Sequence, residues 1–323
     1  MATDPSAGRG RDAERPSEIP QAGWRDVLLR LRRRMVENHL PVIAAGVAFY
    51  ALLAAFPALT ALFGVYGLMF EPQEVTCQLT ALGSVLPAEA SELLLGQLQD
   101  LAQSNRAALG LGVAGGLLLA LWSASVGVRN LMEALNVAYG EEEKRGFLHR
   151  AGLALLLTLG ALACVLAAMG ALVVLPVATR LLGGGAGLQA LVLYARWPLL
   201  ALLFWFGLLV AYRHGPSRAP ARWSWLSWGA LAGTVLWLAG SALFSLYVAS
   251  FGRYNKAYGS MGAVVVLLLW LLLSAYAVLI GAEINAELER QTRRDTTEGA
   301  RKPLGQRGAR AADTVGESPP AAS

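Results

Sequence analysis

Between Leu40 and Met69 the chain carries no Asp, Glu, Lys or Arg. An α-helix rises about 1.5 Å per residue and the hydrocarbon core of a bilayer is about 30 Å thick, so about 20 apolar residues can span it. The run is longer than this minimum. We therefore expect a transmembrane helix that either tilts or bends at Pro57, because proline cannot donate a backbone hydrogen bond inside a helix.

Five further apolar runs follow along the chain. The six expected spans are residues 40–69, 107–128, 152–176, 193–212, 226–248 and 261–282. The whole chain of 323 residues is 55% hydrophobic and only 15% charged, whereas soluble domains have about 25% charged residues. These features predict an all-α, polytopic integral membrane protein with six transmembrane helices, in which residues 24–292 form the membrane domain.

Basic residues are concentrated in alternate connections between the expected spans. They are Arg25, Arg30, Arg32, Arg33 and Arg34 before the first span, Arg129, Lys144, Arg145 and Arg150 after the second, Arg213, Arg218 and Arg222 after the fourth, and Arg290, Arg293 and Arg294 after the sixth. Cytoplasmic loops of membrane proteins carry the excess of Lys and Arg. The pattern predicts a cytoplasmic location for both termini and explains the net charge of +5 without a nucleic-acid partner.

The two ends of the chain are polar. We expect disordered cytoplasmic tails over residues 1–23 and 293–323, because such segments have too few apolar residues to form a core. Three other segments are amphipathic, namely residues 24–35, 90–103 and 129–139. In the first, the apolar stripe consists of Trp24, Val27, Leu28, Leu31 and Met35. These segments predict short interfacial helices that lie on the membrane surface, or alternatively a movable lid or gate.

The sequence contains no recognisable catalytic or metal-binding motif. His39, His149 and His214 lie at the edges of different spans, and none has a second metal ligand three or four residues away. Neither a nucleophile elbow of the Gly-x-Ser-x-Gly type nor a phosphate-binding Gly-x-x-x-x-Gly-Lys-Ser/Thr loop is present. We therefore expect no catalytic residues, no metal and no cofactor.

Arg196 is the basic residue closest to the interior of an expected span. A charge near the bilayer centre is costly and usually functional. Arg196, however, lies about one turn inside the expected outer boundary, where a long side chain beside Trp197 can extend to the interface. The residue is either an interfacial anchor or a substrate contact.

Polar residues also gather near the inner ends of the second and sixth spans. They are Ser125, Arg129, Glu133 and Asn136 on one helical face, and Glu283, Asn285, Glu287 and Arg290 on the other segment. A half-buried charge favours a partner of opposite sign. We hypothesise that Arg129 and Glu283 pair at the cytoplasmic mouth. The alternative is that these charges lie separately among the lipid headgroups.

The loop before the sixth span combines cations and tyrosines. Arg253, Tyr254, Lys256 and Tyr258 directly precede Gly259-Ser260, where the last apolar run begins. Free amides at a helix N-terminus and nearby cations attract anions. This loop is therefore expected on the outer face, as an interfacial anchor or as a contact for a lipid phosphate or an anionic substrate.

The same stretches carry a family resemblance. They are "AAGVAFYALLAAFPAL" in the first span, "LWSASVGVRNLMEALNVAYG" after the second, "RWPLLALLFWFGLLVAYRHGP" for the fourth and "YNKAYGSMGAVVVLLLWLLLSAYAVLIGAEINAELER" at the end. Over roughly residues 24–292 the chain resembles the YihY/BrkB-type family of bacterial inner-membrane proteins, once labelled ribonuclease BN-like. The resemblance implies six spans, a bacterial cytoplasmic membrane, a link to envelope integrity and serum resistance, and for some members suspected export of a lipid A precursor.

Two functions are compatible with these observations. The first is a transporter or flippase-like exporter of an anionic lipid or amphiphile, and the second is a non-transporting membrane scaffold. Ribonuclease activity is not expected. A polar groove lined by Arg129, Glu283 and Asn285 would favour transport, whereas a solid apolar core would favour the scaffold. In both cases anionic membrane lipids are the expected partners, and the sequence leaves a homo-oligomer open.

Overall fold

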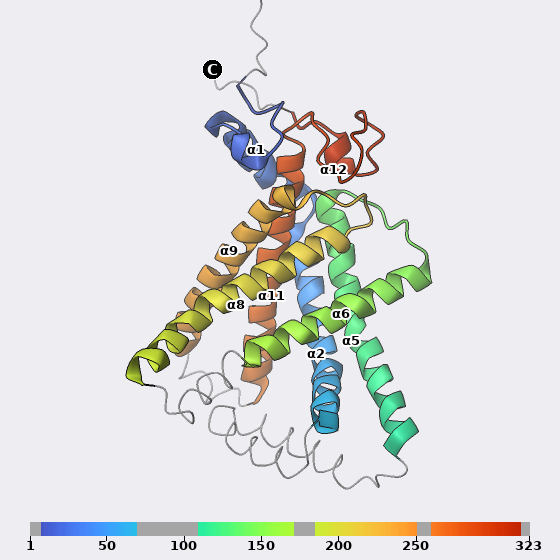
Figure 1. Ribbon diagram of the computed structural model, residues 1–323, viewed down its shortest axis with the longest axis vertical. Coiled ribbons are helices and arrows are strands. Elements are labelled where there is room, and N and C mark those ends of the chain that lie inside the picture. Colours follow the sequence, from blue (N-terminus) through green and yellow to red (C-terminus); the bar gives the residue numbers. More distant parts are fainter. Residues whose placement is uncertain (1–7, 70–108, 171–184, 251–259, 318–323) are drawn as a thin grey trace, which may run out of the picture.

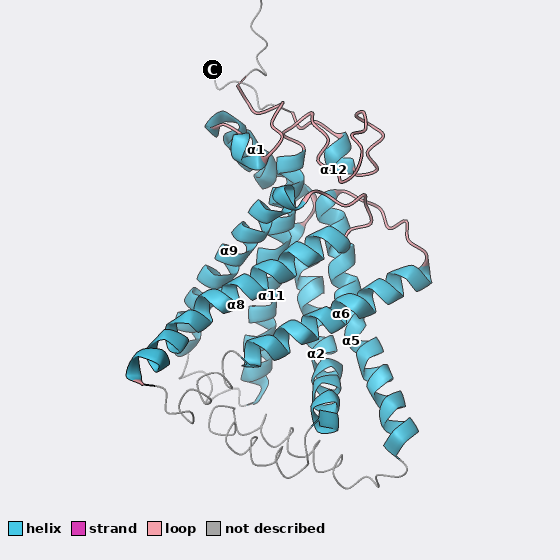
Figure 2. Ribbon diagram, viewed as in Figure 1, coloured by secondary structure: helices cyan, strands magenta, loops and turns pink. Residues whose placement is uncertain are grey.

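The computed structural model describes residues 8–69, 109–170, 185–250 and 260–317 (Figure 1). Helices and connecting loops make up these segments, apart from one isolated antiparallel bridge between Ala221 and Thr297 (Figure 2). The helices are η1 (Pro16–Glu18), α1 (Gln21–Glu37), α2 (Leu40–Met69), α5 (Leu109–Tyr139), α6 (Phe147–Met169), α8 (Ala186–His214), α9 (Trp223–Ser250), α11 (Ser260–Glu289) and α12 (Arg310–Asp313). The expected all-α class is confirmed.

Each expected span corresponds to one long helix of the described chain. Four helices contain segments long and apolar enough to cross a membrane: Phe147–Ala168, Trp197–His214, Trp223–Val248 and Val264–Glu289. The number rises to five if the bent pair formed by Gln21–Glu37 and Leu40–Ala55 counts as a single span. The structure thus has several membrane-crossing helices, and a total of six remains a prediction.

Helix α11 lies between α9 and α2, and α2 packs in turn against α5 (Figure 1). Helix α6 packs on α5, and α8 packs on α9. The buried core is rich in alanine, including Ala44, Ala134, Ala138, Ala230, Ala275, Ala282 and Ala286. Small side chains allow the backbones of membrane helices to approach closely, so the core is held mainly by close backbone contact.

The crossing of α9 and α11 shows this close approach most clearly. A Cβ added to Gly281 would lie 2.6 Å from the carbonyl oxygen of Gly229 and 3.3 Å from the Cα of Gly233. Contacts below 3.0 Å require the backbone to shift, so only glycine fits at position 281. The Gly229-x-x-x-Gly233 spacing therefore forms a helix–helix contact.

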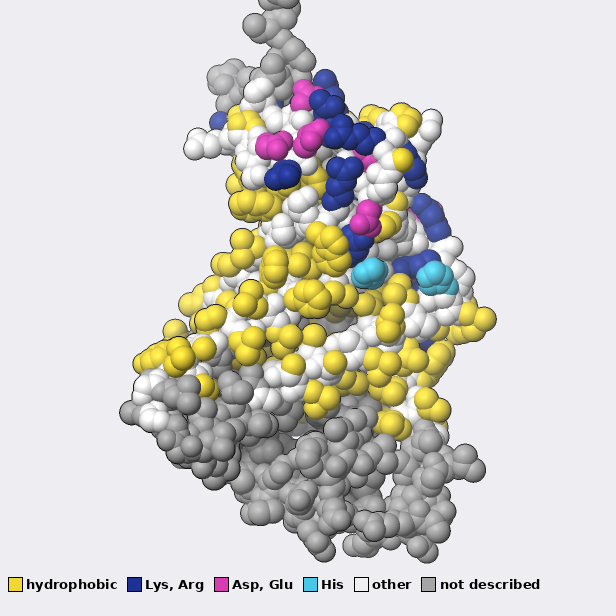
Figure 3. Space-filling view, viewed as in Figure 1, with side chains coloured by type: hydrophobic (Ala, Val, Ile, Leu, Met, Phe, Trp, Pro, Cys, Tyr) yellow, Lys and Arg dark blue, Asp and Glu magenta, His cyan; other side chains and the backbone are white. Residues whose placement is uncertain are grey.

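The charged end of the molecule comprises residues 8–39, 140–146, 215–222 and 290–317. Backbone hydrogen bonds join these segments, from Ala219 N to Gly308 O at 2.9 Å and from Arg222 N to Thr296 O at 3.0 Å. Figure 3 shows the Lys, Arg, Asp and Glu side chains gathered here, above a largely hydrophobic surface. The basic segments predicted to share one side of a membrane thus lie at the same end of the protein.

The described parts of both tails, residues 8–23 and 293–317, differ from the disorder expected of the tails. These segments pack on the charged end, and two of their arginines, Arg11 and Arg307, are buried. The Arg11 guanidinium donates to the carbonyl oxygens of Arg290, Gln291 and Gly316. Arg307, which is 4% exposed, donates to carbonyl oxygens of residues 293, 294 and 312. Arginine has five donors, so polar tails can fold by satisfying backbone carbonyls, which hydropathy cannot reveal.

The segments expected to form interfacial helices also match that expectation only in part. Residues 129–139 are the last turns of α5, and Leu135 and Ala138 lie in the core instead of on a membrane surface. In α1, Val27 and Leu31 are buried within the protein instead of facing a membrane surface, whereas Leu28 is 56% exposed. Residues 90–103 lie outside the described chain.

Helices α1 and α2 meet at a sharp joint. The segments Gln21–Glu37 and Leu40–Ala55 are bent by 65°, and His39 between them has a φ of 47°. This left-handed conformation is uncommon for a residue other than glycine. Helix α2 continues through Pro57 without interruption, and a bend at Pro57 remains a prediction.

Candidate functional site

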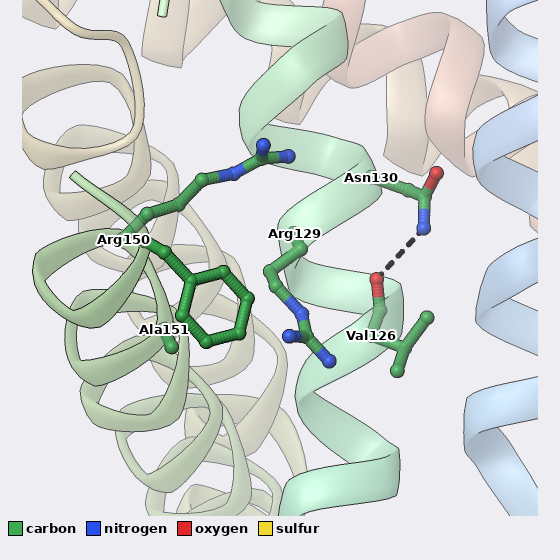
Figure 4. Close-up of a pocket in the computed structure, with 6 residues that line it drawn as sticks. Val126, Arg129, Asn130, Arg150 and Ala151 are labelled. Atoms are coloured by element: carbon green, nitrogen blue, oxygen red, sulfur yellow. Dashed lines mark hydrogen bonds between the residues drawn. The ribbon is translucent and has the colours of Figure 1, made fainter. Parts of the chain in front are cut away.

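A half-open cavity of about 260 Å³ lies between α5 and α6. It is lined by Val126, Arg129 and Asn130 of α5 and by Phe147, Arg150 and Ala151 of α6 (Figure 4). The cavity lies where α5 passes from its exposed apolar part, which includes Leu118 and Leu119, into its buried inner turns. It therefore borders both the apolar surface and the charged end.

Two arginines give the cavity a positive charge. The Arg129 guanidinium carbon lies 5.0 Å from the ring centroid of Trp122, a distance typical of a cation–π contact. Among the described residues, no carboxylate forms a salt bridge with Arg129. Arg150 extends from α6 toward α5 and pairs with Glu133 at 2.5 Å, while its Nε is buried without a hydrogen-bond partner in the described chain. Among the described residues, the charge of Arg129 in this cavity is thus not compensated by a carboxylate.

The hypothesised pair of Arg129 with Glu283 is wrong. Glu283 is fully buried and its Oε1 accepts a hydrogen bond from Asn38 Nδ2 at 2.5 Å. Helix α5 instead turns Arg129 and Glu133 toward α6. Arg129 and Glu283 lie apart because of the way α5 is oriented about its own axis. Packing against the neighbouring helices sets this orientation, and the spacing of residues within one helix does not reveal it.

The other members of the predicted inner cluster do not share one groove. Ser125 Oγ donates to the Trp122 carbonyl at 2.6 Å. Asn136 accepts from the backbone N–H of Ser217 at 2.7 Å. Asn285 accepts from the backbone N–H of Gly229 at 2.8 Å and lies 3.4 Å from the hydroxyl of Tyr139. Asn136 and Asn285 thus hold different contacts between helices or loops, whereas the Ser125 hydroxyl bonds within α5.

A second arrangement, which the sequence did not predict as a unit, is the buried ionic network at the end of α11. Glu287 accepts from Arg30 Nε at 2.6 Å and from Arg290 Nη1 at 2.5 Å. Glu289 accepts from Arg218 Nη2 at 2.6 Å. Burial lowers the pKa of the Arg218 guanidinium, but the charge of Glu289 outweighs burial and leaves this pKa above its ordinary value. The sequence feature that indicates this network is the group of charged residues at the end of the last apolar run.

The loop between α5 and α6 contains a compact ion pair. Arg145 Nη2 and Glu143 Oε2 are 2.7 Å apart. Hydrogen bonds from Arg145 and Asn136 outweigh partial burial and lower the pKa of Glu143 to about 2. Arg145 also donates to the carbonyl oxygens of His214 and Gly215, which end α8. The pair therefore links this loop to the end of α8, and sequence reasoning missed it.

Other predicted site residues remain predictions. Arg253, Tyr254, Lys256 and Tyr258 lie outside the described residues. Arg196 lies in α8, and the structure does not describe its side chain. Over the segments that the structure describes, no group of three His, Cys, Asp or Glu residues could hold a metal ion.

Comparisons with known proteins identify the family. A family model described as virulence factor BrkB matches residues 31–304. YfkH of Bacillus subtilis, named as a ribonuclease-like protein, is 30% identical over 77% of this chain and 90% of its own length. A UPF0761 membrane protein of Aromatoleum aromaticum is 28% identical over 84% of this chain and 65% of its own length.

A UPF0761 membrane protein of Haemophilus influenzae is 23% identical over 80% of this chain and 93% of its own length. No solved structure matches the chain. The match to the family model covers most of the sequence and confirms the resemblance drawn from its motifs. The chain belongs to the BrkB family of membrane proteins.

Proposed function

We propose that the protein is a transporter or flippase-like exporter of an anionic lipid or amphiphile, with a role in the bacterial envelope. The observation that carries the proposal is the uncompensated Arg129 in the cavity between α5 and α6. A guanidinium binds phosphate or carboxylate through paired, charge-assisted hydrogen bonds. A cation held at a half-open cavity suits an anionic headgroup.

The surface next to the cavity suits the apolar part of such a molecule. Leu118 and Leu119 of α5 are 65% and 70% exposed, and Leu148 of α6 is 83% exposed. A ligand with its headgroup at Arg129 would extend its chains along these residues. This combination of a charged cavity and an adjacent apolar surface favours an amphiphile over a small soluble anion.

The proposal includes a membrane arrangement. Six spans in the bacterial cytoplasmic membrane, with both termini in the cytoplasm, would place the charged end and Arg129 at the inner leaflet. Arg196, Arg253, Tyr254, Lys256 and Tyr258 would then meet headgroups at the outer leaflet. The gathering of the basic segments at one end of the described chain supports this orientation. We assign no catalytic role and no cofactor.

Reconstitution tests this proposal. The full-length protein is placed in liposomes, and movement of headgroup-labelled phosphatidylglycerol between leaflets is compared with that of labelled phosphatidylcholine. Arg129→Gln should slow movement of the anionic lipid by about tenfold, because one charge-assisted interaction contributes about 1.5–3 kcal/mol. Arg32→Gln, on the exposed side of α1, is the matched control and should move lipid like the wild type. Wild-type rates equal to those of empty liposomes would exclude transport.

A scaffold that binds lipids or proteins without transport is the second candidate. Two observations favour it. Arg129, Glu283 and Asn285 do not line one groove, and the charged end is packed, with both tails and the buried ionic network covering the end of α11. A scaffold would bind labelled phosphatidylglycerol through Arg129 but would not move it. The same experiment therefore separates the two functions when binding and movement are both measured.

A further inference from the structure

Helix α11 carries two buried glutamates, Glu283 and Glu287, one turn apart. Their exposed fractions are 0% and 1%, but their surroundings differ. Glu287 is surrounded by arginines: Arg30 and Arg290 contact it at 2.6 and 2.5 Å, and Arg34 Nε lies 3.7 Å away. This carboxylate is compensated by nearby positive charge.

Glu283 has no such compensation. Its Oε1 accepts one hydrogen bond from Asn38, and its Oε2 is buried without a partner in the described chain. None of the salt bridges among the described residues includes Glu283. A buried carboxyl group that lacks a cationic partner is more stable with a proton than with a charge.

The groups around Glu283 lead to the same conclusion. The charged or titratable side chains that act on it are Arg34 of α1, Glu287 and Arg290 of α11, and Tyr139 of α5. Both arginines are already held by Glu287. An ionised Glu283 would also face the negative charge of Glu287 one turn away. Two adjacent carboxylates in one environment do not both ionise readily.

The hydrogen bond from Asn38 ties Glu283 to the joint between α1 and α2. Asn38 and His39 form this joint, where the helices bend by 65° and His39 has a φ of 47°. A residue held in this uncommon conformation requires support from its surroundings. Ionisation of Glu283 would strengthen its hydrogen bond with Asn38, because a charged acceptor binds a donor more strongly. It would also draw Arg34 and Arg290 toward Glu283 and away from Glu287.

We propose that Glu283 is a proton-binding site that carries a proton in the packed arrangement seen here, and that release of this proton rearranges the joint between α1 and α2. The proton moves between the carboxyl oxygen of Glu283 and water, and no other bond changes. The inference rests on the proposed function, for which it names the coupling ion: a proton that moves with or against the anionic amphiphile.

Infrared difference spectroscopy tests the proton directly. The full-length protein is compared with Glu283→Gln in lipid nanodiscs at neutral pH, and the wild type should show the C=O band of a protonated carboxyl group that the variant lacks. Glu37→Gln, which removes an exposed carboxylate of α1, should keep the band. If the wild type and Glu283→Gln have the same spectrum in this region, Glu283 is ionised and the proposal is wrong.

Spin labels test the joint. Val36 and Val42 lie on either side of it and are each 71% exposed, so labels at Val36→Cys and Val42→Cys, with both native cysteines replaced by serine, report the angle. The distance between the labels should change when the pH rises above neutral, and should not change in Glu283→Gln. An unchanged distance in both proteins would show that the proton does not control the joint.

Transport in liposomes tests the coupling separately. A pH gradient should change the rate of lipid movement by the wild type several-fold and leave the rate of Glu283→Gln unchanged. A wild type that moves lipid at a rate independent of the gradient would refute coupling but leave the proposed function intact. A wild type that moves no lipid would refute the proposed function, and the infrared result would still decide whether Glu283 carries the proton.

Discussion

At the scale of single residues, several arginine side chains in this protein bind backbone carbonyls. Arg11, Arg145 and Arg307 each donate to carbonyl oxygens near the ends of helices or in loops. The last four carbonyls of a helix have no partner within the helix, and a buried carbonyl needs one. Arginine supplies several donors to such groups at once, which explains why charged residues are buried at the charged end.

The pair of Glu143 and Arg145 gives a prediction about pH. The folded pKa of Glu143 is about 2, below the ordinary value of about 4.3. A lowered folded pKa stabilises the protein above the unfolded pKa, and this stabilisation is lost as the pH falls from about 4.3 to about 2. Glu143→Gln should therefore lower stability at neutral pH by about 1–2 kcal/mol, and less near pH 2.

Thermal unfolding in detergent, followed by intrinsic fluorescence across this range of pH, measures the effect. Glu142→Gln is the matched control, since Glu142 is an exposed neighbour in the same loop. Equal unfolding temperatures of the two variants at neutral pH would contradict the role given to Glu143.

At the scale of elements, contacts between helix backbones determine which helices are neighbours. Gly229 and Gly281 allow α9 and α11 to touch, and Asn285 adds a hydrogen bond from α11 to the backbone of α9. The hydroxyl of Tyr212 donates to the Val278 carbonyl at 2.7 Å and joins α8 to the same place. In a lipid environment, such close packing and polar contacts replace the hydrophobic effect as the force that joins helices.

Adding one methyl group at this crossing should be destabilising. In Gly281→Ala the Cβ would collide with the Gly229 carbonyl and the Tyr212 hydroxyl, and overpacking of this kind costs about 1–3 kcal/mol. Gly160→Ala in α6, where no atom lies within 4 Å of the added Cβ, should be neutral or slightly stabilising because alanine favours the helix. Unfolding in increasing concentrations of denaturing detergent compares the two, and equal stability would show that the crossing tolerates the methyl group.

At the scale of the whole molecule, both tails bind the charged end together. Arg11 from the N-terminal tail contacts Gly316 of the C-terminal tail, and both donate to the carbonyl of Arg290, which directly follows α11. Thr296 donates to Glu289 at 2.7 Å, and the backbone N–H of Arg310 contacts Glu141. The tails thus join α11 to the loop that follows α5.

Removal of residues 293–323 should therefore destabilise the whole membrane domain. The deletion removes the Gly316 carbonyl from Arg11, the Thr296 hydroxyl from Glu289 and the Arg310 N–H from Glu141. Each lost hydrogen bond to a charged group costs about 1.5–3 kcal/mol. Removal of residues 318–323 alone, which deletes none of the contacts just named, is the control and should leave the melting temperature unchanged. Melting of both truncated proteins in detergent decides the matter, and equal melting temperatures would show that the C-terminal tail contributes no stability.

The sequence by itself determined where the long helices lie and which connections share one end. Helix α2 has the predicted bounds, Leu40–Met69, and the basic segments gather at the charged end. Hydropathy and charge are local properties, so they can be read from the order of residues. Tertiary structure alone decided that Arg129 faces α6, that Glu283 binds Asn38 and that the tails fold. These outcomes depend on how each helix is rotated against its neighbours and on the paths of the loops, which local patterns do not record.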